Sequence, residues 1–212
     1  NYSFYNLSSG ASNTALGVSA LYSNTTASNN TAVGYQAGYS NTTGTTLTAF
    51  GFNAAYSNTT GANNIAIGAN SLNSNSTGNS NTVMGYQVAY YNTTGSYNTA
   101  IGDNALKSNT TASNNTAVGY QSLYSTTTGA YNTAIGYQAL QNNTASNNTA
   151  VGHGALVGNT TGTLNCAFGT GQYGVTPGTL QSNTTGSYNT AFGASALANN
   201  TTASNNTAVG YQ

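Results

Sequence analysis

The chain has 212 residues, enough for one large domain or two small ones, but it holds only one Lys or Arg, one Asp or Glu, one His and one Cys. Acid–base, metal and nucleophilic chemistry need several titratable groups at one point, so these four side chains exclude most enzymes. The sequence therefore predicts a protein that is not an enzyme and that has no metal site and no cofactor.

Zero net charge removes the positive field that nucleic acid or an anionic membrane surface requires. The apolar runs are far shorter than the roughly 20 residues of a membrane-spanning helix, and no signal peptide is visible. We expect no nucleic-acid partner and no membrane insertion. The chain opens without Met and stops in mid-pattern, as expected of a processed chain or a segment of a longer one.

A five-residue core, Asn-Thr-Ala-aliphatic or Phe-Gly, recurs along the whole chain. The twelve cores start at Asn13, Asn30, Leu47, Asn64, Asn81, Asn98, Asn115, Asn132, Asn148, Asn165, Asn189 and Asn206. Their spacing is 17 residues seven times, then 16, 17, 24 and 17. We number the unit from the core Asn, so its consensus is N-T-A-V-G-Y-Q-A-L-Y-S-N-T-T-G-S-N.

The predicted elements follow this unit from end to end. Residues 5–12 fit its second half, so the repeat begins before the first core. In each unit, positions 2 to 4 and positions 8 to 10 read as short strands, and S-N-T-T-G-S-N reads as a turn. The 16-residue unit lacks one Thr near Thr144, and the 24-residue unit inserts a loop around Gly171 to Gly178, which holds the only Pro.

The unit length selects the fold class. Seventeen residues are too few for a helical hairpin repeat of about 33, and Thr, Asn and Gly are poor helix formers. The sequence predicts an all-β protein, a parallel β-solenoid of about twelve coils forming one domain over residues 1–212. Stacking at about 4.8 Å per coil gives a rod on the order of 55 to 60 Å long. The alternative to a folded solenoid is a disordered polar chain of low sequence complexity.

Two positions of the unit predict its interior and its sharpest turn. Position 4 is always apolar, which makes it the predicted core facing into each coil, opposite the Leu common at position 9. The core candidates are Leu16, Val33, Phe50, Ile67, Met84, Ile101, Val118, Ile135, Val151, Phe168, Phe192 and Val209. Position 5 is always Gly, as expected where the chain needs positive φ or a close backbone approach. The predicted turn glycines are Gly17, Gly34, Gly51, Gly68, Gly85, Gly102, Gly119, Gly136, Gly152, Gly169, Gly193 and Gly210.

Position 3 is Ala in eleven of the twelve units, with Val83 as the exception. Because side chains alternate along a strand, an inward position 4 places this Ala row on the outer face. A persistent row of small side chains there predicts close packing of another chain, so the expected partner is a second copy of this chain, in a homotrimer or a filament.

The N-T-A-V-G and N-T-A-I-G cores, as in residues 115–119 and 132–136, resemble the head repeats of trimeric autotransporter adhesins of the YadA type. The longer N-T-A-V-G-Y-Q-A-L string with its S-N-T-T-G turn is also similar to repeats of phage and viral tail-fibre proteins. The resemblance implies a left-handed parallel β-roll in which three identical chains associate. This chain departs from the adhesin pattern in having 17 rather than about 14 residues per coil, and in lacking a neck or coiled-coil segment.

The four residues with reactive or charged side chains are best interpreted as structural, without a catalytic or metal-binding role. Asp103 and Lys107 occupy positions 6 and 10 of one coil and are expected to form an exposed ion pair. His153 lies three coils from Asp103, roughly 14 Å along the stack, which excludes a His-Asp dyad. Cys166 replaces the usual Thr at position 2 and is interpreted as a small core or interface residue.

Tyr rows leave two interpretations open. The rows run through positions 6, 10 and 17, and the residues singled out at positions 6 and 10 are Tyr35, Tyr86, Tyr120, Tyr137, Tyr22, Tyr39, Tyr56, Tyr90 and Tyr124. They either stack to rigidify neighbouring coils and bury surface between chains, or they form a platform for cell-surface carbohydrate or another receptor.

The turns carry the N-glycan acceptor pattern N-x-(T/S) in nearly every coil. The candidate acceptors are Asn24, Asn41, Asn58, Asn75, Asn92, Asn109, Asn142, Asn159, Asn183 and Asn200. The same residues are good turn formers, because Asn and Thr bond local backbone groups. Thr rows could also bind ice, but the adjacent pairs Thr42-Thr43 and Thr93-Thr94 allow only one Thr of each pair to point outward.

These patterns predict a non-enzymatic structural protein, located outside the cell, on the cell surface or on a virion, that works as a stiff fibre, shaft or adhesin segment. A carbohydrate- or receptor-binding module using the Tyr rows or the inserted loop is the alternative, and ice binding is a weaker one.

Overall fold

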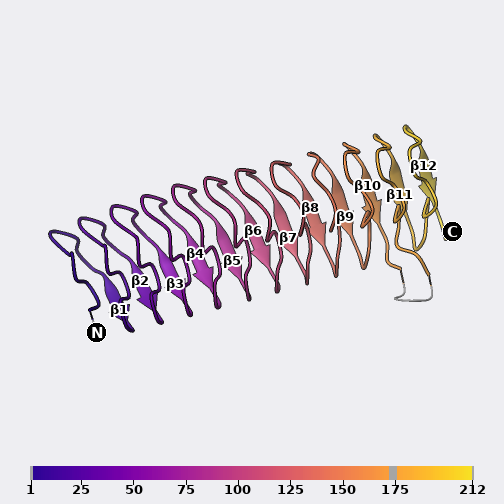
Figure 1. Cartoon of the computed structure of the whole chain (residues 1–212). Helices are drawn as coiled ribbons and strands as arrows, with labels where there is room; N and C mark the ends of the chain where they lie inside the picture. Colours follow the sequence, from indigo (N-terminus) through magenta and orange to yellow (C-terminus); the bar gives the residue numbers. More distant parts are fainter. Residues whose placement is uncertain (1, 172–175, 212) are drawn as a thin grey trace.

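The computed structural model describes residues 2–171 and 176–211, and in these residues the chain is a β-solenoid. Each coil contributes one three-residue strand, and successive coils stack into a rod (Figure 1). The strands are β1 (Thr14–Leu16), β2 (Thr31–Val33), β3 (Thr48–Phe50), β4 (Ile65–Ile67), β5 (Thr82–Met84), β6 (Thr99–Ile101), β7 (Thr116–Val118), β8 (Thr133–Ile135), β9 (Thr149–Val151), β10 (Cys166–Phe168), β11 (Thr190–Phe192) and β12 (Thr207–Val209). The predicted all-β fold class is confirmed.

The strands form one parallel sheet in chain order, β1 to β12, and pair in register, like on like. Thr116 pairs with Thr133, Ala117 with Ala134 and Val118 with Ile135. The register survives both irregular units, because Thr133 pairs with Thr149 across the 16-residue unit and Cys166 pairs with Thr190 across the 24-residue one. Changes of coil length are therefore absorbed in the turns, never in the strands.

The second predicted strand, at positions 8 to 10, does not form. Those residues belong to a tight turn in which positions 7 and 9 both have positive φ, as at Gln121 (φ 53°) and Leu123 (φ 49°). Alternating left-handed residues cannot extend as a strand. They still pair with neighbouring coils, since the Leu123 N–H donates to the Ala139 carbonyl at 3.0 Å.

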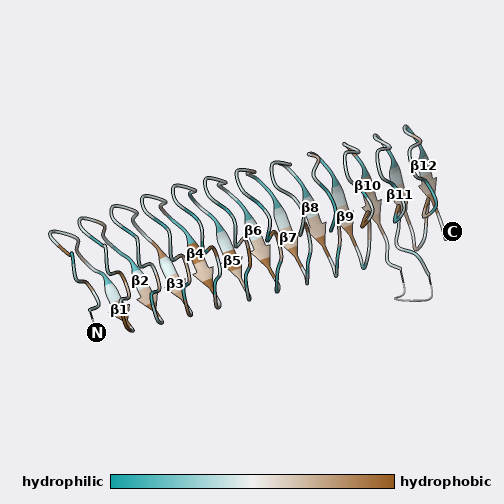
Figure 2. Cartoon of the chain, viewed as in Figure 1, coloured by the Kyte–Doolittle hydropathy of each residue, from teal (hydrophilic) through white to brown (hydrophobic). Residues whose placement is uncertain are grey.

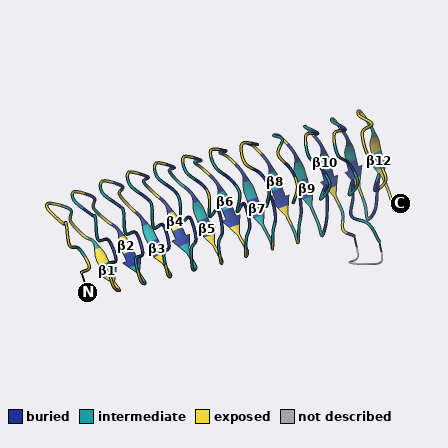
Figure 3. Cartoon of the chain, in the orientation of Figure 1, coloured by how far each residue is buried: buried dark blue, intermediate teal, exposed yellow. Residues whose placement is uncertain are grey.

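The prediction that the position 4 side chains form the core is wrong, because the strands turn the opposite face inward. The position 3 side chains point inward and are buried from Ala32 to Ala191, whereas the position 4 side chains are exposed or half-buried. Ala66 is 0% exposed, while Phe50 and Met84 are 55% and 45% exposed. The set that faces outward comprises Leu16, Val33, Phe50, Ile67, Met84, Ile101, Val118, Ile135, Val151, Phe168, Phe192 and Val209. Figure 2 shows apolar colour on the strands themselves, and Figure 3 shows how far each segment is buried.

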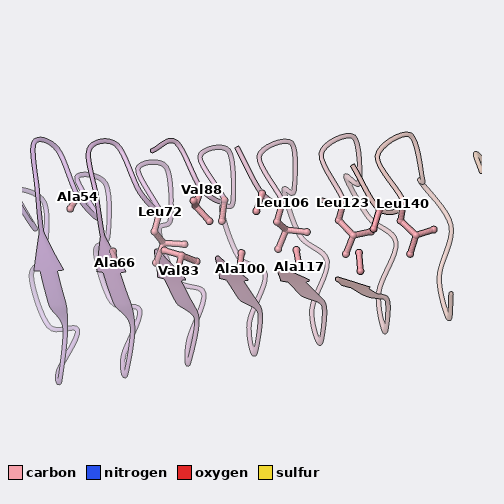
Figure 4. Packing of buried hydrophobic residues seen from close by; sticks show 14 of the residues in the cluster. Ala54, Ala66, Leu72, Val83, Val88, Ala100, Leu106, Ala117, Leu123 and Leu140 are labelled. Carbon is pink, nitrogen blue, oxygen red and sulfur yellow. The ribbon is translucent and has the colours of Figure 1, made fainter. Parts of the chain in front are cut away.

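The thinness of the coil explains this inversion. The position 9 Leu side chains, predicted to be inward, are buried from Leu21 to Leu180, and they fill the interior from the turn. Figure 4 shows Leu106 and Leu123 facing the strand residues Ala100 and Ala117 across the coil. With Leu on one side, only a methyl group fits on the other, because interiors are close-packed. The buried Ala row is therefore the coil's own core and does not contact a second chain.

The position 5 glycines have positive φ, as predicted, with values such as 129° at Gly119. A Cβ on Gly119 would lie 2.5 Å from the carbonyl oxygen of Gly136 in the next coil. Both conditions that call for Gly are thus met at one position: a backbone region closed to L side chains and a close approach between coils.

The inserted loop predicted around Gly171 to Gly178 lies partly outside the described residues, because 172–175 are not described. On its two sides the chain remains attached to the stack. The Gly171 N–H donates to the His153 carbonyl at 3.2 Å, and the Pro177 carbonyl accepts a hydrogen bond from Ser195 Oγ at 2.8 Å.

Candidate functional surfaces

The outer face of the sheet carries two parallel rows of side chains. Strand alternation places positions 2 and 4 on this face. Position 2 is Thr in most coils, and position 4 gives a continuous apolar row of aliphatic and Phe side chains, which we call the outer apolar row. Within it, Phe168 stacks on Phe192 with ring centroids 5.0 Å apart. An unbroken exposed apolar strip along a rod is the signature of a contact surface.

The Tyr residues of position 10 stack along the rod. Tyr5, Tyr22, Tyr39 and Tyr56 lie in four successive coils, with neighbouring centroids 4.9, 4.9 and 5.1 Å apart and nearly parallel rings. Burial by neighbouring atoms, followed by the charges of Tyr5 and Tyr39, raises the pKa of the Tyr22 hydroxyl. Tyr22, Tyr39 and Tyr56 are half-buried, whereas Tyr5 in the first coil is 59% exposed; the stacking agrees with the structural interpretation of this row.

Position 6 forms shorter aromatic stacks. Tyr120, Tyr137 and His153 stack with centroids 5.3 and 5.0 Å apart, and Tyr35 stacks on Phe52 at 5.4 Å. These Tyr side chains are more exposed than those of position 10. The ring of His153 continues a structural stack three coils from Asp103, as the repeat register predicted.

The Tyr residues of position 17 behave differently. Tyr97, Tyr131 and Tyr188 are 63%, 62% and 58% exposed. None of the three contacts another ring among the described residues, and all have positive φ near 60°. They form part of an exposed line along one turn, here called the turn row: Tyr97, Asn114, Tyr131, Asn147, Leu164 and Tyr188.

Two internal ladders of Asn side chains hold the coils together on the turn side. At position 12, Asn75 Nδ2 donates to Asn58 Oδ1 of the preceding coil at 2.7 Å and to the Gly78 carbonyl of its own turn at 3.0 Å. At position 1, the Asn98 backbone N–H and its Nδ2 both donate to Asn81 Oδ1, and Nδ2 also reaches the Ala112 carbonyl at 2.9 Å. Sequence reasoning missed both ladders, although near-invariant Asn at positions 1 and 12 was their signal.

The ladders overturn most of the glycan prediction. Eight of the candidate acceptors are 0% exposed: Asn24, Asn41, Asn58, Asn75, Asn92, Asn109, Asn159 and Asn183. Their amide nitrogens are hydrogen-bonded inside the coil, as Asn41 Nδ2 is to the Gly44 carbonyl at 2.8 Å. A glycan on such an amide is incompatible with the fold. Asn142 alone of the ten is exposed, because in the 16-residue unit Asn143 takes the ladder position. Asn200 is half-buried and still donates to Asn183 Oδ1 at 2.8 Å.

The turn Thr pairs divide their roles as expected. The position 13 hydroxyls are bonded to the next coil, since Thr42 Oγ1 donates to the Thr59 carbonyl at 3.0 Å and Thr93 Oγ1 to the Thr110 carbonyl at 2.9 Å. Their neighbours Thr43 and Thr94 are exposed. In these turns one Thr of each pair therefore faces solvent.

The predicted ion pair does not form. Asp103 Oδ1 accepts a hydrogen bond from the Tyr86 backbone N–H at 3.0 Å, while Lys107 Nζ donates to Gln87 Oε1 at 2.8 Å and lies 5.8 Å from the Tyr124 ring centroid. Both charges are thus satisfied by neighbouring coils, because the turn between positions 6 and 10 separates them.

Cys166 lies half-buried on the outer face of β10, between Thr149 and Thr190. Burial raises the pKa of its thiol, so the protonated, unreactive form prevails at neutral pH. Among residues 2–171 and 176–211, no three His, Cys, Asp or Glu side chains gather as a metal site. A hollow beside the last coil is lined by Pro177, Leu197 and Val209.

No family model, curated protein or solved structure matches the chain. The described residues also contain no helix that is long and apolar enough to cross a membrane. The candidate surfaces are therefore the outer apolar row, the aromatic stacks and the turn row, and their function must be argued from their own geometry.

Proposed function

We propose that the chain is a structural rod, a fibre, shaft or adhesin segment, that assembles side by side with copies of itself outside the cell or on a virion surface. The observation that carries this proposal is the outer apolar row, which runs from β1 to β12 without a charged residue. The repeats' similarity to adhesin heads and tail fibres supports the same role, and so does a rod held by hydrogen bonds at every coil.

The size of the row fits an interface between two such rods. Twelve strands spaced by about 4.8 Å give a strip about 53 Å long. A strip roughly 10 Å wide covers about 500 Å² per chain, and adding the Thr row beside it approaches the roughly 800 Å² per partner of a stable interface. Side-by-side rods bury such a strip along its whole length, whereas a compact partner would cover only part of it.

The charge of the chain favours association with itself. One Lys or Arg and one Asp or Glu in 212 residues leave no repulsion between identical rods. Proteins with net charge near zero associate readily, and the absence of titrating groups from the outer apolar row makes this association insensitive to pH.

The experiment measures molar mass by light scattering coupled to size exclusion. We expect a multiple of the 21.3 kDa chain mass, threefold for a trimer and larger for a filament. Replacing Phe50, Met84, Ile101 and Ile135 with Thr should give a monomer whose β-type circular dichroism spectrum is unchanged, because these side chains are outside the coil core.

The matched control replaces four exposed turn residues, Thr43, Thr60, Thr94 and Thr111, with Ser. This control should assemble like the natural chain. A natural chain that stays monomeric at high concentration would refute the proposal, as would a Thr variant that assembles unchanged.

A further inference from the structure

The turn row contains aromatic side chains that the fold itself does not use. Tyr97 and Tyr131 are 63% and 62% exposed, and neither contacts another aromatic ring among the described residues. By contrast, the position 10 side chains Tyr22 and Tyr39 stack at 4.9 Å and are half-buried. The turn row therefore presents to solvent Tyr rings that contribute little to the stability of the coil.

The Tyr residues of this row also have a backbone conformation that is unfavourable for a bulky side chain. Tyr97 and Tyr131 have φ of 60°, the left-handed region, which Asn adopts readily and bulky side chains adopt at a cost. The equivalent residues Asn114 and Asn147 have φ of 61° and 63°. Tyr at these positions therefore costs conformational energy without gaining burial, so packing of the coil does not explain why Tyr stands there.

The backbone fixes the spacing of the row. The Asn114 N–H donates to the Ser96 carbonyl at 3.1 Å, the Tyr131 N–H to the Ser113 carbonyl at 3.3 Å and the Asn147 N–H to the Ala130 carbonyl at 3.0 Å. Consecutive turns are thus one sheet spacing apart. Apolar side chains recur at every second turn, at Tyr97, Tyr131 and Leu164, so they are about 9.6 Å apart.

Amides fill the intervening places. Asn114 and Asn147 are exposed, and their side chains are not used in either Asn ladder. From Tyr97 to Leu164 the row thus alternates an apolar side chain with an amide that can donate and accept hydrogen bonds, and Tyr188 then follows Leu164 directly in the next coil. Asp103 and Lys107, the acidic and the basic side chain of the chain, belong to positions 6 and 10 and not to this row.

We propose that the turn row binds an uncharged linear polysaccharide of β-1,4-linked hexopyranose units. In such a chain successive rings are flipped, so the repeat is two sugars, and that repeat spans nearly the distance between alternate coils. The apolar C–H face of one sugar in each pair stacks on Tyr97 and Tyr131. The equatorial hydroxyls of the sugar between them hydrogen-bond to the Asn114 amide.

The test uses the whole chain and two probes of known linkage. Retention is measured as the protein that pellets with microcrystalline cellulose beyond the amount that pellets without it, and binding of soluble cellohexaose is measured by isothermal titration calorimetry, because a chain of zero net charge hardly migrates in affinity electrophoresis. The test variants are Tyr97→Asn and Tyr131→Asn, singly and together. We expect each to weaken binding about tenfold, corresponding to roughly 1.4 kcal/mol. Because Asn is the residue found at the same position in neighbouring coils, these variants keep the fold and relieve backbone strain.

Two controls separate this site from the rest of the rod. Tyr120→Ser with Tyr137→Ser alters the position 6 stack and should leave retention unchanged, and amylose, an α-1,4-linked glucan with a helical chain, should not bind. The proposal is overturned by folded protein that cellulose does not retain, by Y97N/Y131N retained as well as the natural chain, or by equal binding to amylose. None of these outcomes depends on whether the rods associate.

Discussion

The two sides of each coil are held together by different forces, and they tolerate change differently. On the strand side, the inward Ala of the strand and the position 9 side chain that faces it from the turn pack without directional bonds, and position 9 varies in size between Leu, Ala and Gly. On the turn side, Asn amides bond from coil to coil at positions 1 and 12, and their identity hardly varies. Apolar packing conserves volume, whereas a hydrogen-bond ladder conserves the chemical group.

The strand side shows its tolerance in compensating pairs. Gly38 stands where most coils have Leu, and Leu47 replaces a ladder Asn; a Cβ on Gly38 would lie 3.2 Å from Leu47 Cδ2. Leu47 thus fills the space that Gly38 leaves. In a similar exchange, Val83 replaces the strand Ala in the coil where Ala89 replaces Leu, and all of these side chains are buried.

The turn side shows what happens when the pattern is broken. Thr126 occupies position 12, where an Asn would donate to the preceding coil, and its hydroxyl bonds instead to the Asn143 carbonyl at 2.8 Å. The acceptor below it, Asn109 Oδ1, is left buried without a hydrogen-bond partner. No change of volume elsewhere can repair a missing donor.

The largest effect is expected from Asn92→Leu, which keeps the branched shape and the number of side-chain heavy atoms and removes the hydrogen bonds. Asn75 Oδ1 loses its donor and Asn109 Nδ2 loses its acceptor, bonds now 2.8 and 2.6 Å long. Two buried unsatisfied groups at about 1 to 3 kcal/mol each should lower the free energy of unfolding by roughly 3 to 5 kcal/mol, measured by denaturant titration. An effect below about 1 kcal/mol would contradict the ladder's role.

Leu123→Ala should cost somewhat less, about 2 to 4 kcal/mol, because it opens a cavity opposite Ala117. The volume-conserving Leu123→Met is the matched control and should cost below about 1.5 kcal/mol. Equal losses for the Ala and Met variants would show that the strand side is as specific as the turn side. The readout is the same denaturant titration.

The pair Gly38 and Leu47 offers a double-mutant cycle. Gly38→Leu alone overfills the coil and Leu47→Asn alone empties it, each costing about 1 to 3 kcal/mol. The double variant restores the consensus at both positions and should recover most of the loss. Additive losses in thermal unfolding would mean that the two side chains do not compensate each other.

The smallest effect should be a gain. Thr126→Asn places a donor above Asn109 Oδ1 and should stabilise the chain by about 1 kcal/mol. Thr126→Val, which supplies no donor and removes the Thr126 hydroxyl bond to Asn143, is the control and should destabilise. A stabilising Val variant would show that the unpaired oxygen is not the weakness at this coil.

The repeat predicted the parallel solenoid, the coil boundaries, the turn glycines and the inward Leu. It could not predict which face of the strand turns inward, because strict alternation fits either face and Val33 looks more like core than Ala32. The thickness of the coil decides, and that is a property of the closed coil. The Asn residues were interpreted as surface turn chemistry because an isolated turn has no neighbouring coil to accept the amide.

Wherever two successive coils both have Asn at position 12, the amides point the same way, with Nδ2 toward the Oδ1 of the coil before, as at Asn58, Asn75 and Asn92. A formed coil consequently presents a row of oriented groups to the next stretch of chain, which needs only to dock and close. Folding should therefore be slow to start and fast to spread, one coil at a time from an ordered neighbour. Each folded coil thus acts as a template on which the next coil folds. Where the Asn ladder is interrupted, as at Thr126, this propagation of folding should pause.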